Sequence, residues 1–153
     1  MYKHLLLSIV LSITVLSAYA TPSWKINSKG GIEWKIEKEQ LPHKDHIEMS
    51  GEQMAFVLRW GIDANGVLDL ERSLVFPLLR TIPNNTHASL MHRFATDVIS
   101  LVSVNGRSLQ NENTRLIEID GMFRSISEFG GGIEVERVIF PSVDKPFMCE
   151  RYV

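Results

Sequence analysis

The sequence contains a single cysteine, Cys149, among its 153 residues. One cysteine cannot form a disulfide within the chain, which excludes the small disulfide-rich scaffolds common among secreted domains. The folded state must therefore be stabilised by packing. This favours a bacterial envelope or secreted protein of ordinary composition.

An excess of basic residues is also missing. Lys and Arg number 16 against 18 Asp and Glu, which gives a formal net charge of −2. Proteins that bind nucleic acid normally carry a basic surplus, because they neutralise backbone phosphates. We therefore expect an ordinary soluble surface and no nucleic-acid partner.

No apolar run is long enough to cross a membrane. The run Leu5–Leu16 spans about a dozen residues, whereas a spanning helix needs about twenty. It follows the basic Lys3 and precedes Ala18-Tyr19-Ala20, the small-x-small pattern that signal peptidase recognises. Residues 1–20 are therefore predicted to be a signal peptide, and residues 21–153 one exported domain without a membrane segment. The predicted location is the periplasm or the medium of a Gram-negative bacterium.

Sustained helical periodicity is absent after the signal peptide, and apolar residues instead alternate with polar ones or form short runs. The predicted strands cover residues 24–27, 32–37, 54–62, 67–76, 88–94, 98–104, 114–119, 122–129 and 133–140. Turn dipeptides such as Asn65-Gly66 separate them, and residues 42–44 are interpreted as a polar link. Short strands about ten residues apart predict an all-β fold, an antiparallel, supersandwich-like β-sandwich.

One more strand is expected at the end of the sequence. Residues 147–153 alternate apolar and polar side chains, and no turn residue or polar tail follows them. A strand at a bare terminus leaves backbone groups without partners. The sandwich is therefore predicted to be incomplete at its C-terminus, as the front part of a longer protein.

Histidine pairs are the first candidates for chemistry. His43 and His46 are three apart in the polar link, and His87 and His92 are five apart, which places them on opposite faces of an extended strand. Neither pair has the accompanying cysteine or carboxylate ligands of a zinc site. No metal and no cofactor are predicted.

Carboxylate pairs are the second candidates, because glycosidases use two carboxyl groups at set separations. Asp69 and Glu71 share one face of a predicted strand, as do Glu134 and Glu136. A solvated sheet face accounts for both pairs, and no nucleophile–base cluster or phosphate-binding loop accompanies them. No catalytic residue is therefore predicted.

The three tryptophans could stack on sugar rings through their apolar faces. Trp34 lies in register with Ile32 and Ile36, and Trp60 lies within the most apolar strand, so both are predicted to belong to the core. Trp24, close to the predicted new terminus, is left open as a core residue or a sugar platform.

The segment Leu79–His87 is the most unusual peptide of the chain, because it gathers side chains that hydrogen-bond polyols well. The candidate substrate-binding residues are Arg80, Asn84, Asn85 and His87. The alternative is that asparagine and threonine side chains simply satisfy the backbone of a loop. A ligand-facing or interdomain loop is thus the functional interpretation.

Several segments resemble the amino-terminal β-sandwich of secreted bacterial six-hairpin glycosidases. They are residues 45–51, 75–90, 137–142 and 150–152, and they are spread over most of the mature chain. In that group the sandwich precedes an (α/α)6 toroid that holds the catalytic acid and base. The resemblance implies that this chain is the non-catalytic domain of a glycan-degrading enzyme, packing against a toroid outside this sequence and lending it loops. No catalytic residue can be carried over.

Two other classes of function remain open at this point. A free-standing carbohydrate-binding module requires a complete sandwich with an exposed aromatic platform. An envelope interaction domain requires an exposed sheet edge through which it could associate with another chain.

Overall fold

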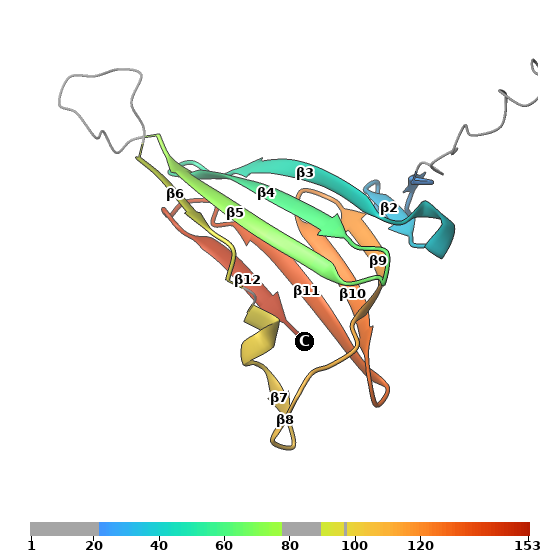
Figure 1. The fold of residues 1–153 in the computed structure, drawn as a ribbon. Coiled ribbons are helices and arrows are strands. Elements are labelled where there is room, and N and C mark those ends of the chain that lie inside the picture. The colour runs from blue at the N-terminus through green and yellow to red at the C-terminus, as the bar shows by residue number, and fades with distance from the viewer. Residues whose placement is uncertain (1–21, 78–89, 97) are drawn as a thin grey trace, which may run out of the picture.

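The computed structural model describes residues 22–77, 90–96 and 98–153, and it is built from antiparallel strands (Figure 1). One sheet has six strands in the order β1-β2-β9-β10-β11-β12. These strands are β1 (Lys25–Ile26), β2 (Ile32–Lys35), β9 (Asn113–Ile119), β10 (Phe123–Phe129), β11 (Ile133–Pro141) and β12 (Met148–Tyr152). We call this the large sheet.

A second sheet of four strands, the small sheet, has the order β3-β4-β5-β6. Its strands are β3 (His43–Ser50), β4 (Ala55–Ile62), β5 (Leu68–Phe76) and β6 (Leu90–Phe94). The remaining elements are two short 3-10 helices, η1 (Lys38–Gln40) and η2 (Val98–Leu101), and a small hairpin of β7 (Ser103–Val104) and β8 (Arg107–Ser108). The predicted all-β fold with antiparallel sheets is therefore confirmed.

The hydrophobic core lies between the two sheets. Alternate residues of β4 point inward, so Phe56, Leu58, Trp60 and Ile62 are all buried. They belong to one cluster with residues of the large sheet, namely Trp34, Ile117, Phe123 and Ile139. Period-two alternation on both inner faces is what closes a β-sandwich. In a smaller cluster, Ile99 of η2 is grouped with Phe129 and Val135 of the large sheet.

The predicted turns are confirmed where they connect hairpins. Asp63 accepts backbone hydrogen bonds from Asn65 and Val67 at 2.8 and 2.9 Å, and Gly66 takes a left-handed φ of 89° between β4 and β5. The strand predicted over residues 147–153 is β12, which pairs with β11. The ladder extends to Val153, which exchanges two backbone hydrogen bonds with Glu136.

Two predictions about local structure are wrong. Residues 43 and 44 do not belong to a polar link but begin β3, so His43 and His46 both lie on a strand. Sequence patterning missed β3 because it is an edge strand, where exposed charged side chains are tolerated. Residues 98–104 do not form one strand: η2 occupies the first part, since burying Ile99 under this turn takes the place of strand pairing.

Candidate functional site

The loop predicted to contact substrate connects β5 to β6. Its candidate residues Arg80, Asn84, Asn85 and His87 lie outside the described residues, so their arrangement stays a prediction. Its two anchors are placed, because Phe76 and Leu90 are cross-strand partners in the small sheet. The site is therefore built from the surfaces that surround these anchors and from the other described residues.

Charged side chains occupy part of the interior, a feature that the sequence analysis missed. Arg72 on β5 is 1% exposed and forms a bidentate ion pair with Glu150 on β12, with Nη2 donating to Oε2 at 2.8 Å. The Tyr152 hydroxyl donates to the same Oε2 at 2.6 Å. Burial and the neighbouring Glu150 carboxylate raise the pKa of the Tyr152 phenol above its ordinary value.

A second arginine, Arg137 on β11, is also buried in the interior. Its Nη1 donates to Glu112 Oε1 at 2.7 Å and to the Ser127 hydroxyl at 3.0 Å. Its guanidinium lies over the Phe129 ring, 5.8 Å from the centroid. Both buried cations are thus paired with carboxylates, as burial of a charge requires.

The outer face of the large sheet carries a ladder of alternating charge. Arg124 on β10 bridges Glu118 on β9 and Glu136 on β11, with N–O distances of 2.8 and 3.1 Å. Arg151 on β12 adds a second bond to Glu136 at 3.0 Å. The hydrogen bond from Arg124, together with its positive charge, holds the pKa of Glu136 below its ordinary value.

The structure shows the surroundings of the two carboxylate pairs identified in the sequence. Glu136 is ionised and bound to two arginines, while Glu134 is exposed. On the small sheet, Glu71 accepts a hydrogen bond from Arg59 at 3.0 Å, and Asp69 is exposed. Both pairs therefore lie on outer sheet faces, as the solvated interpretation predicted. A general acid needs a carboxyl whose pKa is raised, which is the opposite of the environment around Glu136.

The three tryptophans meet at one end of the core. Trp34 and Trp60 are buried, which confirms their predicted core positions, and Trp34 Nε1 donates to Gln40 at 2.6 Å. Trp24 is half-buried and packs against both, with ring centroids 6.0 and 6.4 Å away. Trp24 thus contributes to the aromatic cluster and is not a freely exposed platform.

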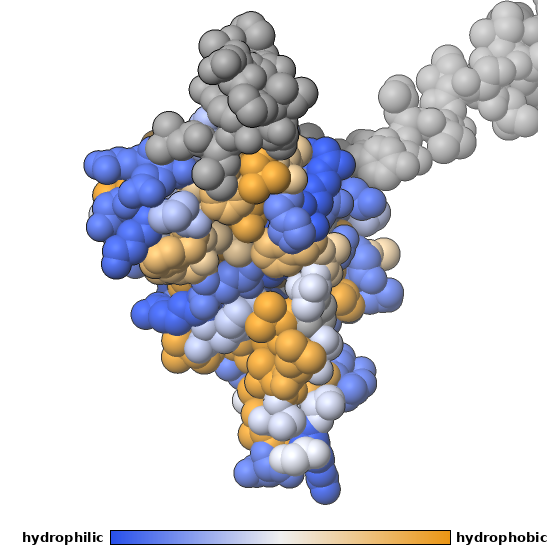
Figure 2. Space-filling model, turned by 90° about the vertical axis from the view of Figure 1, so that its left-hand side faces the viewer, coloured by the Kyte–Doolittle hydropathy of each residue, from blue (hydrophilic) through white to orange (hydrophobic). Residues whose placement is uncertain are grey.

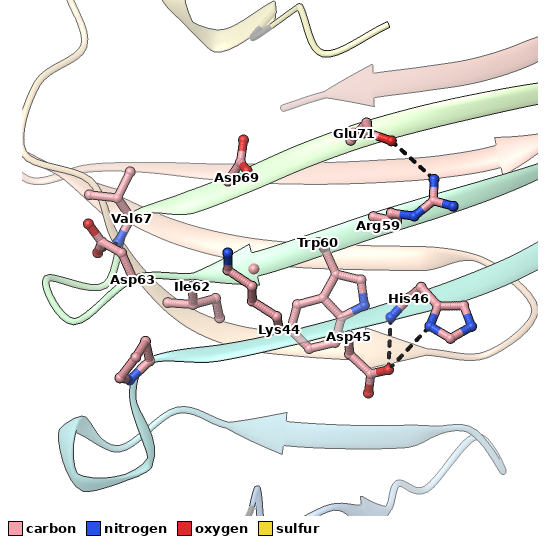
Figure 3. Close-up of a pocket in the computed structure, with 12 residues that line it drawn as sticks. Lys44, Asp45, His46, Arg59, Trp60, Ile62, Asp63, Val67, Asp69 and Glu71 are labelled. Atoms are coloured by element: carbon pink, nitrogen blue, oxygen red, sulfur yellow. Dashed lines mark hydrogen bonds and ion pairs between the residues drawn. The ribbon is translucent and has the colours of Figure 1, made fainter. Parts of the chain in front are cut away.

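A groove of about 570 Å³ crosses the outer face of the small sheet, and we call it the Gly61 groove (Figure 3). Register places Lys44, Gly61 and Asp69 side by side on β3, β4 and β5, and His46, Arg59 and Glu71 side by side on the next row. Figure 3 shows the side chains of Lys44 and Asp69 from the first row and those of His46, Arg59 and Glu71 from the second. Its other lining residues are Pro42, Asp45, Trp60, Ile62, Asp63 and Val67.

The groove mixes hydrogen-bond donors and acceptors. Arg59 is held in place by Glu71 and by the Ser73 hydroxyl, both at 3.0 Å. Asp63 accepts backbone N–H groups, of which that of Val67 contributes most, and these hold its pKa below the ordinary value. Lys44 forms no ion pair with any residue that the structure describes.

One side of the molecule exposes apolar surface. The view in Figure 2 faces the side on which Figure 1 shows β6, β12 and η2, and apolar residues are visible there in several pieces. Exposed apolar side chains in these elements and next to them are Leu90, Met91, Leu101, Val104, Phe147 and Val153. We call this surface the apolar side.

Across residues 22–77, 90–96 and 98–153, no three His, Cys, Asp or Glu side chains converge as metal ligands would. The same part of the chain contains no helix of the length and hydrophobicity needed to span a membrane. Comparison with protein-family models, with curated proteins and with solved structures found no match for this chain. Its class is therefore defined by its fold: an antiparallel β-sandwich with ion-paired arginines inside and a mixed-charge groove outside.

Proposed function

We propose that this chain is a non-catalytic β-sandwich domain of an exported glycan-degrading enzyme, which packs against a catalytic domain. The resemblance to the amino-terminal sandwich of six-hairpin glycosidases supplies the class of enzyme. The proposal requires a sandwich that buries a core of its own, presents a surface to a neighbouring domain, and leaves acid–base chemistry to that neighbour.

The apolar side is the observation that carries the proposal. Exposed apolar residues scattered singly are ordinary, whereas several gathered on one side are typical of an interaction surface. Met91 and Leu101 are 54% and 77% exposed, and they come from β6 and η2, which neighbour each other on this side (Figure 1). Leu90, the anchor at which the segment containing Arg80 and His87 ends, belongs to β6 on this side.

The charged groups support a role without catalysis. Glycoside hydrolysis needs one carboxyl held protonated and a second one ionised. Glu118, Glu136 and Glu150 are each hydrogen-bonded to an arginine, and the bond from Arg124 lowers the pKa of Glu136. Such groups stabilise the sandwich and give no general acid.

Two experiments test this function. The purified chain, assayed on a panel of plant and bacterial polysaccharides, is expected to release no reducing sugar, and turnover that follows the purified protein would overturn the proposal. The reading frame downstream of codon 153 is expected to encode an (α/α)6 toroid. A stop codon with no such domain after it would contradict the arrangement.

A free-standing module that binds sugar through Trp24 is less well supported. The ring of Trp24 makes an edge contact with Trp60 at an interplanar angle of 83°, within the aromatic cluster. A stacking platform needs an open ring face. Affinity electrophoresis of Trp24→Ala distinguishes the two: retardation by a polysaccharide that disappears in this variant would favour the module.

A further inference from the structure

Gly61 occupies an unusual position for a glycine. It lies in β4, an inner strand of the small sheet, paired on both sides. Glycine weakens a strand interior, because it loses more conformational entropy on folding than other residues and has no side chain to pack. Where it occurs there, it usually marks a bulge, a bend, or a place where a ligand or another backbone approaches closely.

The backbone does not explain this glycine. Register runs without a shift from Lys44 to Gly61 and from Gly61 to Asp69, so there is no bulge. Gly61 is not one of the glycines with a left-handed φ. An added Cβ would meet no backbone atom closer than the His43 carbonyl oxygen at 3.4 Å. A larger residue would therefore displace only the stem of Lys44, whose Cγ lies 3.1 Å from an added Cβ, and it would fill the floor of the Gly61 groove.

We propose that the Gly61 groove binds a neutral sugar residue, which displaces the stem of Lys44 from the backbone of Gly61 and lies between Lys44 and Asp69. That this surface is a ligand site follows from the glycine and the groove, whereas the assignment of the ligand as part of a glycan rests on the proposed function. Trp24 is not among the residues that line this site.

The dimensions of the groove fit a sugar ring. Adjacent strands lie about 4.8 Å apart, so the Cα atoms of Lys44 and Asp69 are separated by about 10 Å across Gly61. The volume of about 570 Å³ lies within the usual range for small-ligand sites. The stem of Lys44 now lies over the glycine, with its Cγ 3.1 Å from an added Cβ, and this flexible side chain would swing aside or cover the ligand.

The charges of the groove select a neutral ligand. Asp69 offers acceptors to sugar hydroxyls and Lys44 offers donors. The carboxylates that line the groove outnumber its lysine and arginine side chains. The acidic residues are Asp45, Asp63, Asp69 and Glu71, and the basic ones are Lys44 and Arg59. This excess repels phosphates and uronic acids. The groove contains no exposed aromatic face, so binding is expected to be weak, with a Kd on the order of 1 mM.

Chemical-shift mapping tests the site. The ¹⁵N-labelled chain is titrated with the tetrasaccharides of cellulose, xylan, mannan and chitin, and with tetragalacturonate as the anionic comparison. At least one neutral tetrasaccharide is expected to shift the amides around Lys44, Gly61 and Asp69, and tetragalacturonate is not. Shifts confined to other surfaces, or none with any neutral tetrasaccharide, would overturn the proposal.

Two variants test whether the groove is the place where the tetrasaccharide binds. Gly61→Val is expected to abolish these shifts without lowering the unfolding midpoint, because it fills the floor and suits a strand. Asp69→Ala changes an exposed residue and is expected to weaken binding about tenfold. Val57→Thr, on the same face of β4 but outside the groove, is the control and should bind as the parent does.

If Gly61 only gives room to the stem of Lys44, Gly61→Val will bind as the parent does, and the inference fails. This result is separate from a failure of the proposed function, which the hydrolysis assay and the downstream reading frame measure. Turnover with intact groove shifts would remove the non-catalytic role and leave the sugar site in place.

Discussion

Arg72 and Glu150 form a two-bond ion pair inside the sandwich, although they are 78 residues apart in the sequence. The Arg72 side chain is 1% exposed and that of Glu150 is 11% exposed. The pair joins β5 of the small sheet to β12 of the large sheet, so it crosses the interior from one sheet to the other.

Breaking this pair from one side should destabilise the fold strongly. Arg72→Met leaves the Glu150 carboxylate buried without its cation, and the free energy of unfolding is expected to fall by about 3–5 kcal/mol. Urea unfolding followed by tryptophan fluorescence measures the change. Arg59→Met, which removes an exposed pair with Glu71, is the control and should cost about 1 kcal/mol or less. Equal losses in both variants would mean that the interior pair has no special role.

Acid should weaken the outer ladder of the large sheet. The pKa of Glu136 is lower in the folded chain than its ordinary value of 4.5, because Arg124 bonds to the carboxylate. Its stabilising contribution is therefore present above about pH 4.5 and is lost as the pH falls through the folded pKa. The variant Glu136→Gln should lose less stability than the parent between neutral pH and about pH 3. Urea midpoints of both proteins, measured at the two pH values, test this. An equal decrease in midpoint for parent and variant would contradict it.

High pH should destabilise the fold through Tyr152. Burial raises the pKa of its phenol above the ordinary value of 10.0, so the folded state resists ionisation that the unfolded chain undergoes. The contribution is complete below about pH 10 and is lost as the pH rises above it. Tyr152→Phe should therefore flatten the alkaline decline in stability, as followed by circular dichroism. An unchanged decline would place the responsible group elsewhere.

Two glycines of the small-sheet hairpin region should respond differently to a methyl group. A Cβ on Gly51 would overlap the carbonyl oxygen of Ser142, a backbone atom that cannot move aside cheaply. Gly51→Ala is expected to cost about 1–3 kcal/mol. In Gly61→Ala the new Cβ lies 3.1 Å from the flexible stem of Lys44 and 3.4 Å, an ordinary contact, from the His43 carbonyl oxygen, so the change is expected to be neutral or stabilising by up to about 1 kcal/mol. Thermal unfolding of the two variants compares them directly, and a reversed order would be incompatible with these contacts.

The apolar side should limit the solubility of the isolated chain. Met91→Lys combined with Leu101→Lys replaces two exposed apolar side chains with charged ones. The double variant is expected to remain monomeric at higher concentration than the parent, with a similar unfolding midpoint. Size-exclusion chromatography across a concentration series measures this, and identical behaviour of parent and variant would argue against an interaction surface.

Alternation in the sequence predicts the inner strands well and the edges poorly. Phe56, Leu58 and Trp60 repeat every second residue because β4 buries one face, so its position could be predicted. On β3 the first inward positions are His43, which packs against Trp34 and Trp60, and Asp45, which is exposed, so the apolar pattern disappears. Residues 98–104 contain enough apolar side chains for a strand, yet only Ser103 and Val104 find a partner, in β8, and no local pattern reveals this.

Predicting the candidate site requires tertiary contacts that a single sequence does not contain. Arg72 alternates in phase with Leu68, Leu70 and Leu74, and this phase could have placed it on the inner face. Its partner Glu150 could not be found in this way, because pairing between sheets depends on tertiary register. The Gly61 groove likewise needs three strands in register, with Lys44 and Asp69 brought to either side of one glycine.

The ion pair between Arg72 and Glu150 also constrains when the chain can fold. As synthesis proceeds, the small-sheet residues emerge before β12, so the Arg72 guanidinium has no counter-charge until β12 has been made. Contacts that span so much of the sequence slow folding, because the intervening loop must close before they form. Burial of Arg72 is therefore delayed until translation has passed Glu150, so the two sheets of this sandwich are expected to close together only after β12 has been made.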